Sequence, residues 1–241
     1  MGTLLNSLAV VASIIWTVFI SSIAIPCFLI QDEWGHYCHR LWAKVVLRLM
    51  GVNVTYLNQE NLPDHTGAIL AANHQSQFDI FVLAAMPINF KWVSKAEVAR
   101  IPFVGWTLKV MGTFLVKRNR SDHDVNVMIE VEEGLREGKR IAIFPEGTRT
   151  RTGNLLPLKK GAFRTAQNSG VPIYPIAILG TYSIAPAGKL PRHRGHRVVV
   201  KIGPPIAVGK QEEIAFAMGK FKSELEKLLE ECRRVASGKP A

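Results

Sequence analysis

Two side chains capable of acid–base chemistry lie in the stretch NHQSQFD, residues 73–79, between two apolar runs. The imidazole of His74 can accept a proton near neutral pH, and a carboxylate at Asp79 can hold one ring nitrogen while the other acts as a base. Residues five apart do not share a face of a continuous helix, so this pairing requires a turn that enters a helix. The alternative is a capped turn in which Asp79 serves only the helix N-terminus.

Two further polar stretches contain basic side chains that could bind a phosphate group. They are VKRNR, residues 116–120, and FPEGTRTRTG, residues 144–153. Arginine binds phosphate through a bidentate fork and lysine through a point charge. Glu146 could hold an arginine or bind a substrate hydroxyl. The candidate basic side chains are Lys117, Arg118, Arg149 and Lys160. Solvated basic surface is an equally good interpretation of Arg120, Arg151 and Lys159.

These stretches follow segments whose composition is typical of β-strands. Enrichment in β-branched residues, with Gly, Pro or Asn punctuation, predicts seven strands. Helical spacing of apolar residues predicts helices directly after NHQSQFD and over 121–138, 160–170 and 211–235. Strands that alternate with helices predict an α/β domain in which helices cover a sheet. The predicted strands are 52–57, 68–72, 90–94, 113–116, 140–144, 172–178 and 197–202.

All three polar stretches begin where a predicted strand ends. NHQSQFD follows 68–72, VKRNR starts at the end of 113–116, and FPEGTRTRTG starts at the end of 140–144. In α/β sheets, ligands bind at the carboxyl ends of the strands. Their shared position favours one functional site over three unrelated surface loops.

The N-terminal segment has the composition of a membrane anchor. No charged residue occurs before Asp32, and residues 4–30 exceed the roughly 20 residues that a helix needs to cross a hydrocarbon core. A cleaved signal peptide usually has a basic n-region and a shorter apolar run. We therefore expect an uncleaved anchor, in which Pro26 could end the helix, bend it or help it turn back within one leaflet. A buried helix of a soluble core is the less favoured alternative.

A second predicted helix, residues 33–51, has a basic stripe opposite an apolar face that contains tryptophan. Arg40, Lys44 and Arg48 form the stripe, because they are four residues apart. This pattern favours a helix in the membrane interface, and an amphipathic helix packed on the domain is the alternative. Basic residues after an anchor predict that the rest of the chain lies on the cytoplasmic side.

Size and charge agree with a membrane-anchored enzyme. The 241 residues divide into N-terminal membrane-anchoring helices, residues 1–50, and one α/β domain, residues 51–241. The net charge of +11 favours an anionic membrane or a phosphate-bearing substrate. The basic stretch PRHRGHR, residues 191–197, has no interleaved aromatic residues for base stacking, so we expect no nucleic-acid partner. Three widely spaced cysteines indicate no disulfide framework.

The signatures of several other enzyme classes do not occur in the sequence. It contains no G-x-S-x-G, G-x-G-x-x-G or H-E-x-x-H. His36 and His39 form an H-x-x-H pair, but that spacing at a membrane boundary matches no recognised metal motif, so we expect no metal. Ser76 could act as a covalent nucleophile beside His74, although direct transfer does not require one.

The chain resembles the glycerolipid acyltransferase family, and within it the 1-acyl-glycerol-3-phosphate acyltransferases. Four motifs occur in the family's order, namely NHQSQFD, GTFLVKR, FPEGTRTRTG and VPIYPIAI, with LKKGAF between the last two. The resemblance spans roughly residues 52–203. It implies a mixed β-sheet flanked by helices and docked on the membrane by N-terminal helices.

The resemblance also implies a reaction. An acyl group would pass from acyl-CoA or acyl carrier protein to the sn-2 hydroxyl of lysophosphatidic acid, giving phosphatidic acid without a cofactor. The site would face the cytoplasm, at the inner membrane in a bacterium. Family members with another acceptor, such as glycerol-3-phosphate, another lysophospholipid or a lyso-aminolipid, are the alternative. A non-enzymatic basic protein of the membrane surface is a more distant one.

Roles for individual residues follow from the same resemblance. His74 is implied to be the general base and Asp79 its orienting carboxylate. Arg118 would bind the acceptor's phosphate, whereas Lys117 stands where relatives often have Asp and leaves the choice of acceptor open. Pro172, in the fourth motif, would shape the acyl-chain pocket. The third motif would add Glu146, Gly147, Thr148 and Arg149 to the phosphate site.

Overall fold

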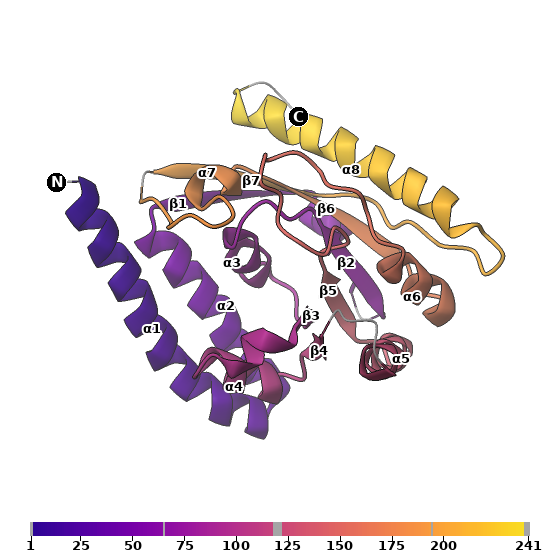
Figure 1. Ribbon diagram of the computed structural model, residues 1–241, viewed down its shortest axis with the longest axis horizontal. Coiled ribbons are helices and arrows are strands. Elements are labelled where there is room, and N and C mark those ends of the chain that lie inside the picture. The colour runs from indigo at the N-terminus through magenta and orange to yellow at the C-terminus, as the bar shows by residue number, and fades with distance from the viewer. Residues whose placement is uncertain (1, 65, 118–121, 194, 239–241) are drawn as a thin grey trace.

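A seven-stranded mixed sheet forms the centre of the molecule, with the strand order β1-β7-β6-β2-β5-β3-β4 (Figure 1). The computed structural model describes residues 2–64, 66–117, 122–193 and 195–238. All neighbouring strands are parallel except β6 and β7. The fold class and all seven predicted strands are confirmed. The strands are β1 (Val52–Leu57), β2 (Ala68–Ala72), β3 (Lys91–Lys95), β4 (Phe114–Val116), β5 (Arg140–Ile143), β6 (Ile173–Leu179) and β7 (His196–Ile202).

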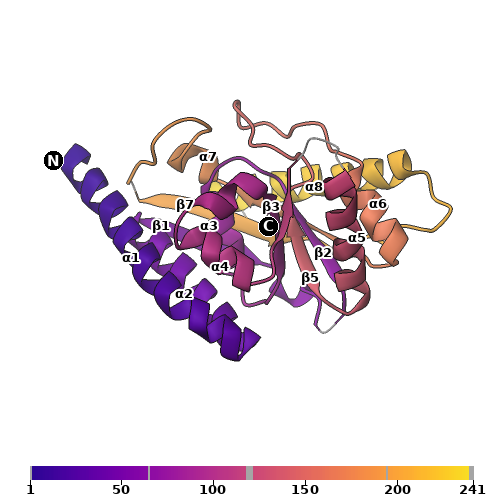
Figure 2. The same cartoon turned by 60° about the horizontal axis from the view of Figure 1, so that its bottom comes forward.

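Helices cover both faces of this sheet, as the two views show (Figures 1 and 2). One layer contains α1 (Gly2–Ile30), α2 (Asp32–Leu49), α3 (Phe78–Ala84) and α4 (Val104–Val110). The opposite layer contains α5 (Asp122–Arg136), α6 (Gly161–Ser169) and α8 (Ile214–Ala236). The short helices α4 and α7 (Thr181–Ile184) were not predicted, because so few turns leave no clear periodic pattern. Two 3₁₀ turns complete the chain, at Gln59–Asn61 and Ala96–Arg100.

Strand β2 is buried on both faces and joins the two halves of the core. Ala68, Leu70 and Ala72 pack in the layer that contains α2 and α3. Ile69 and Ala71 point to the other side and pack with α5, α6 and α8. All five residues are buried, as expected for a central parallel strand with alternating side chains. The polar residues that follow Ala72 therefore start from a rigid position.

Helices α1 and α2 fold back on one another as a hairpin. The indole N–H of Trp16 donates to the Trp42 carbonyl at 3.3 Å, and the indole N–H of Trp42 donates to the Thr17 hydroxyl at 3.0 Å. Pro26 does not end the helix, which continues to Ile30. The hairpin turns at Gln31, the residue between the two helices.

The apolar side of α2 packs against protein. Its buried residues include Cys38, Ala43 and Val46, and they belong to the core beneath α1 and α3. These residues thus pack on the domain, as the alternative interpretation expects. Trp34, Lys44 and Arg48 remain exposed, and contact of α2 with the membrane interface stays a prediction.

The outer side of α1 is apolar and exposed. Leu8, Ile15 and Phe19 are 58, 64 and 55% exposed, although each is large and apolar. Within the described residues, α1 is the helix long and apolar enough to cross a membrane, and only 22% of its apolar window is buried. So little burial does not fit the core helix of a soluble protein, and the predicted contact with lipid remains the better interpretation.

The exposed side of α1 can be tested without disturbing its packing on α2. We expect replacement of Leu8, Ile15 and Phe19 by lysine to move the protein from the membrane fraction to the soluble fraction, because each buried charge is costly in hydrocarbon. Fractionation with immunoblotting measures the shift, and the matched control replaces the same three residues by valine. Full membrane retention of the lysine variant would contradict lipid contact at this face.

The start of β2 depends on close approach by the last turn of α5. A Cβ atom on Gly67 would lie 1.9 Å from the Leu135 carbonyl oxygen. We therefore expect Gly67→Ala to lower the free energy of unfolding by about 1–3 kcal/mol, measured by denaturant titration. Gly219→Ala is the matched control, because a Cβ there meets nothing within 4 Å and lies inside α8. That variant should be as stable as wild type or more stable. Equal stability of all three proteins would contradict this packing.

Candidate active site

Polar segments from three neighbouring parallel strands meet at one edge of the sheet. β2 lies between β5 and β6, and all three strands run in the same direction. NHQSQFD follows β2 and FPEGTRTRTG follows β5, as predicted. The third segment, residues 180–185 with helix α7, follows β6 and was not recognised in the sequence. β4 ends at the same edge, two strands away from β5, so VKRNR begins roughly 10 Å to the side.

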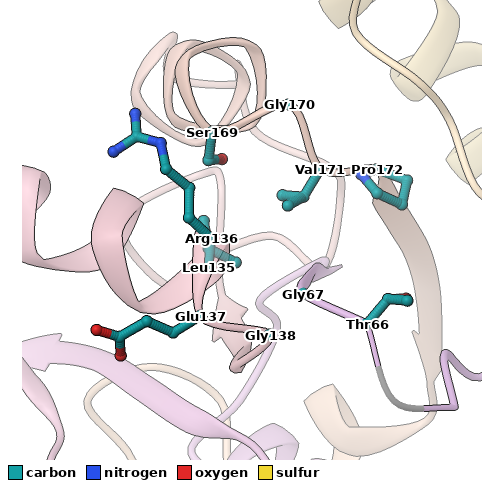
Figure 3. Close-up of a pocket in the computed structure, with 10 residues that line it drawn as sticks. All are labelled: Thr66, Gly67, Leu135, Arg136, Glu137, Gly138, Ser169, Gly170, Val171 and Pro172. Atoms are coloured by element: carbon teal, nitrogen blue, oxygen red, sulfur yellow. The ribbon is translucent and has the colours of Figure 1, made fainter.

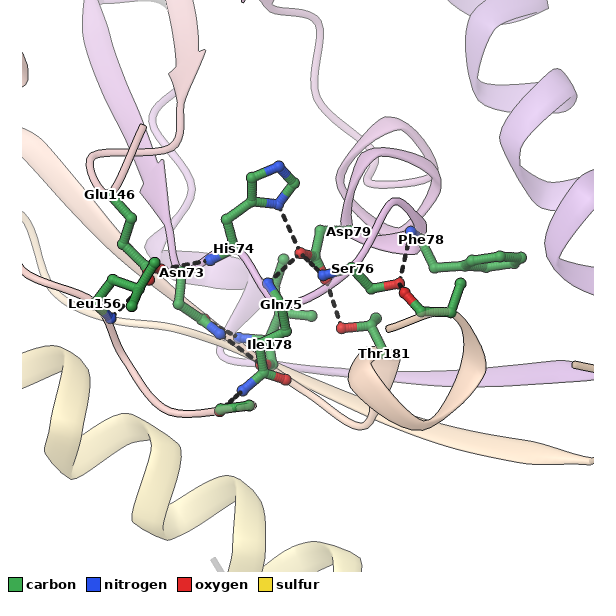
Figure 4. A network of polar contacts seen from close by, with 12 residues as sticks. Asn73, His74, Gln75, Ser76, Phe78, Asp79, Glu146, Leu156, Ile178 and Thr181 are labelled. Carbon is green, nitrogen blue, oxygen red and sulfur yellow. Dashed lines mark hydrogen bonds and ion pairs between the residues drawn. The ribbon is translucent and has the colours of Figure 1, made fainter. Parts of the chain in front are cut away.

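His74 and Asp79 form the predicted pair (Figure 4). The Nδ1 atom of His74 lies 2.8 Å from Oδ2 of Asp79, which is fully buried. The same oxygen accepts the backbone N–H groups of Gln75 at 2.7 Å and Ser76 at 2.8 Å. A carboxylate that already accepts two N–H groups accepts a third from Nδ1, which leaves Nε2 without a proton. Nε2 points away from this network, and 14% of the His74 side chain is exposed.

The segment after β5 binds both the backbone N–H and the backbone carbonyl of His74. Oε1 of Glu146 accepts the His74 N–H at 2.6 Å, and the Thr150 N–H donates to the His74 carbonyl at 2.9 Å. The side-chain amide of Gln75 donates to the Gly153 carbonyl at 2.9 Å. With its donor and acceptor both engaged, the peptide of His74 has little freedom to rotate. FPEGTRTRTG therefore positions the imidazole in addition to supplying basic side chains.

Phe144 lies flat against the imidazole of His74. The two ring centroids are 3.8 Å apart and the planes differ by 11°. Phe144 is the first residue after β5, so the sheet fixes its position. An aromatic face attracts a cation that lies against it. No role was predicted for Phe144 from the sequence.

Glu146 has a structural role that differs from the predicted one. It was placed among the phosphate-binding residues, yet its side chain is 2% exposed and both of its oxygens accept backbone N–H groups. Oε2 takes the Leu156 N–H at 2.7 Å. Burial raises the pKa of Glu146 from 4.5 to about 7, and the two N–H donors partly offset that rise. Because the side chain is buried and both of its oxygens are engaged by backbone N–H groups, Glu146 fixes the loop and is not presented to a phosphate.

Strand β6 and the unpredicted segment after it bind NHQSQFD from the other side. The Asn73 side chain exchanges two hydrogen bonds with the Ile178 backbone, at 2.7 and 2.9 Å. The Ser76 hydroxyl donates to the Ala185 carbonyl at 2.8 Å. The Thr181 hydroxyl lies 2.5 Å from Oδ1 of Asp79. NHQSQFD is thus held between two segments that are distant in the sequence (Figure 4).

The predicted basic residues are only partly placed by the structure. Lys117 is exposed just after β4, whereas Arg118 lies outside the described residues. In the third motif, Thr148 is exposed and Arg149 is half-buried, and both precede the Thr150 N–H that contacts His74. Arg149 is therefore adjacent in sequence to Thr150, the residue whose N–H donates to the His74 carbonyl.

Gly147 makes room for a lysine from another segment. Its φ is +70°, and a Cβ would lie 2.7 Å from the Nζ atom of Lys159. The Lys159 N–H also donates to the Pro145 carbonyl at 2.8 Å. Lys159 therefore lies against the third motif, which gives it a defined place beside the site.

Pro172 does not join the site. It precedes β6, so it lies at the amino end of that strand, whereas His74 follows the carboxyl end of the parallel strand β2. The seven residues of β6 separate the two positions by roughly 20 Å. Pro172 instead lines a shallow depression near Gly67 and Arg136 (Figure 3). Pro172 therefore does not contact the His74–Asp79 pair, and its role in shaping an acyl-chain pocket stays a prediction.

The H-x-x-H pair of α2 is engaged within the protein. Nε2 of His36 lies 3.2 Å from Asp32, and Nε2 of His39 accepts the Trp92 indole N–H at 3.4 Å. Burial lowers the pKa of His39 to about 3, so its ring is neutral. Within the part of the chain that the structure describes, no group of three or more His, Cys, Asp or Glu residues could hold a metal ion.

Comparisons with known proteins agree with this arrangement. Residues 53–179 match the model of the acyltransferase family. A chloroplastic 1-acyl-sn-glycerol-3-phosphate acyltransferase, LPAT1 of Arabidopsis thaliana, is 35% identical over 174 residues, which are 70% of this chain and 48% of that protein. The 1-acyl-sn-glycerol-3-phosphate acyltransferase of Saccharomyces cerevisiae is 33% identical over 172 residues, 70% of this chain and 56% of that protein. The chain thus spans about half the length of these relatives.

A solved structure shares the fold over nearly the whole molecule. The 1-acyl-sn-glycerophosphate (LPA) acyltransferase PlsC of Thermotoga maritima superposes with a TM-score of 0.85 at 24% identity, and the match covers 96% of both chains. The fold is therefore that of PlsC, including the helices outside the matched family segment. From the family match over more than half of its residues, this chain belongs to the acyltransferase family.

Proposed function

We propose that this protein transfers a fatty acyl group to the sn-2 hydroxyl of lysophosphatidic acid, giving phosphatidic acid. The observation that carries the proposal is the His74–Asp79 pair, which leaves Nε2 available at the carboxyl edge of the sheet. We infer the acceptor from the relatives, which are named 1-acyl-sn-glycerol-3-phosphate acyltransferases. The donor is a thioester, either acyl-CoA or acyl carrier protein.

The geometry supports direct transfer through general-base catalysis. Nε2 of His74 takes the proton from the acceptor hydroxyl as its oxygen attacks the thioester carbonyl carbon. The tetrahedral intermediate then collapses, the C–S bond breaks, and the thiolate takes the proton from the imidazolium. Asp79 and the Phe144 ring stabilise that imidazolium between the two steps. General-base catalysis of this kind contributes about 10²–10⁴ to a rate.

The contacts of Ser76 argue against a covalent acyl-enzyme. Its side chain is fully buried, and its hydroxyl donates to the Ala185 carbonyl and accepts the Phe78 N–H. A hydroxyl engaged in this way is not presented to a substrate. Direct attack by the acceptor therefore fits the site better than a serine nucleophile.

The basic residues around the edge suit an anionic acceptor at a membrane surface. Arg149 and Lys159 belong to or contact the loop that holds His74, and Lys117 follows β4 at the same edge. Arg118, the next residue in the sequence, lies outside the described residues and is included on the basis of the second motif alone. In the proposal they bind the acceptor's phosphate, with the exposed side of α1 in the membrane. The catalytic domain then works at the cytoplasmic face, at the inner membrane in a bacterium.

An acceptor panel tests this function. Purified protein in detergent is supplied with a labelled acyl donor, as the CoA or the carrier-protein thioester, and with lysophosphatidic acid, glycerol-3-phosphate, another lysophospholipid or a lyso-aminolipid. We expect transfer to lysophosphatidic acid to be fastest. Equal or faster transfer to another acceptor would overturn the choice of substrate. Absence of transfer to all of these acceptors would overturn the proposal that the protein is an acyltransferase acting on them.

Substitution of the proposed base tests the mechanism separately. We expect His74→Ala to lower the rate of transfer by at least about 10²-fold, because the hydroxyl then loses its base. His196→Ala is the matched control, since it removes a half-buried histidine at the start of β7. It should transfer at the wild-type rate. Near-wild-type transfer by His74→Ala would rule out this mechanism.

The raised pKa of Glu146 makes the free energy of unfolding depend on pH, and the sign of that dependence follows from the direction of the shift. Its pKa is 4.5 ordinarily and about 7 in the folded chain, so the folded protein keeps a proton that the unfolded chain releases. The stabilising contribution is complete below the ordinary pKa and is lost as pH rises through about 7. We expect wild type to lose on the order of 2 kcal/mol of its stability relative to Glu146→Gln over this interval. Denaturant titrations of both proteins measure this change, and a wild-type stability that stays constant or rises relative to Glu146→Gln as pH increases through this interval would contradict the assignment.

A further inference from the structure

Thr181 is a buried threonine that the reaction proposed above does not yet use. It begins helix α7 and its side chain is fully buried. The preceding residue, Gly180, has φ +104°, and a Cβ there would lie 2.3 Å from the Arg197 carbonyl oxygen. Only glycine fits this turn without strain. The turn after β6 therefore places the Thr181 hydroxyl against Asp79.

The hydroxyl completes the hydrogen bonding of the Asp79 carboxylate. Oδ2 accepts the ring N–H of His74 and two backbone N–H groups. Oδ1 lies 2.5 Å from the Thr181 hydroxyl, which must donate because an ionised carboxylate only accepts. Among the residues that the structure describes, Thr181 supplies the hydrogen bond to Oδ1 (Figure 4). Hydrogen bonds to charged acceptors are short and strong, and this one belongs to that class.

Anchoring Oδ1 controls the direction of Oδ2. The two oxygens turn together about the bond from the carboxylate to Cβ, and a terminal torsion of this type is broad when nothing restrains it. A carboxylate held at both oxygens keeps Oδ2 in line with Nδ1 of His74. Because the imidazolium forms during transfer, any loss of alignment weakens its stabilisation at the step where it is needed.

We propose that Thr181 is a positioning residue, whose hydroxyl orients Asp79 and through it the base His74. This inference rests on the proposed acyl transfer. Thr181 acts on the carboxylate and touches no substrate atom in this role. Removal of its hydroxyl therefore lowers kcat and leaves KM for the acceptor nearly unchanged.

A purely structural role predicts different behaviour. Strand β6 is tied to NHQSQFD by the two Asn73–Ile178 hydrogen bonds, and the segment after β6 is tied to it by the Ser76–Ala185 hydrogen bond. These bonds remain when only the Thr181 hydroxyl is lost. The Thr181–Asp79 contact is therefore not required to hold α7 in place.

Three variants test the proposal in the full-length enzyme. Thr181→Val removes the hydroxyl at nearly constant shape, Thr181→Ser keeps it, and Thr165→Val makes the same change at a buried threonine of α6. With lysophosphatidic acid and an acyl thioester, we expect Thr181→Val to lower kcat by about tenfold to a hundredfold, the loss of one hydrogen bond to a charged group. KM should stay within about twofold, and Thr181→Ser and Thr165→Val should stay within about threefold of the wild-type kcat.

A double-mutant cycle with Asp79→Asn shows whether the effect passes through the carboxylate. If it does, Thr181→Val has little further effect in the Asp79→Asn background. A folded Thr181→Val enzyme with wild-type kcat, or one whose loss is fully additive with Asp79→Asn, would overturn the proposal. Where Thr181→Val does not fold, Thr181→Cys decides, because its weak thiol donor should give a kcat between those of wild type and Asp79→Asn. A wild-type enzyme inactive with every acceptor would overturn the proposed function and this inference together, whereas an active one isolates the role of Thr181.

Discussion

The buried carboxylate of Asp79 is the group around which the site is organised. A carboxylate removed from water must find donors within the protein, since an uncompensated buried charge is very costly. The donors are the backbone N–H groups of Gln75 and Ser76, the ring of His74 and the hydroxyl of Thr181. The backbone turns at residues 75–76, so that both N–H groups point to the carboxylate, and this turn brings the ring of His74 to Asp79 in the first turn of α3. The same carboxylate therefore orients the proposed base and fixes the local backbone.

The order of the strands explains how distant segments meet this demand. β5, β2 and β6 are adjacent and parallel, so the segments that follow them lie side by side although the hydrogen-bonded residues are 72 to 109 positions apart in the sequence. Glu146 and Thr150 bind the backbone of His74 from one side. On the other side, Asn73 is tied to β6 and Ser76 to the segment of α7. Phe144 then closes one face of the imidazole. The remaining ring nitrogen, Nε2, is directed toward the open edge.

Much of this arrangement could be predicted from the sequence, because it depends on local patterns. β-branched strands, helical apolar spacing and polar residues after strands predicted the sheet and the place of the site. His74 and Asp79 could be paired because a turn into a helix relates them over a short range. The position of Pro172 follows from strand direction, because a residue that precedes the parallel strand β6 lies at the edge opposite His74.

The remaining features depend on contacts that leave no mark in a single sequence. Thr181 is 102 residues from Asp79, and a threonine after a strand has no signature of its own. Glu146 looked like a binding group because the backbone N–H donors that engage it are invisible in the sequence. The pattern of α2 favoured the membrane interface, and the packing of its buried residues beneath α1 and α3 depends on contacts that the sequence alone does not specify.

The protonation of the two ring nitrogens of His74 is the property on which the proposed chemistry depends most directly. Nitrogen NMR of protein labelled at histidine, with the His74 signals assigned through His74→Gln, reports which nitrogen carries the proton. At mildly alkaline pH we expect the neutral tautomer with the proton on Nδ1, hydrogen-bonded to Asp79, and a proton-free Nε2. A neutral His74 with its proton on Nε2, or an even mixture of the two tautomers, would contradict a base held ready by Asp79.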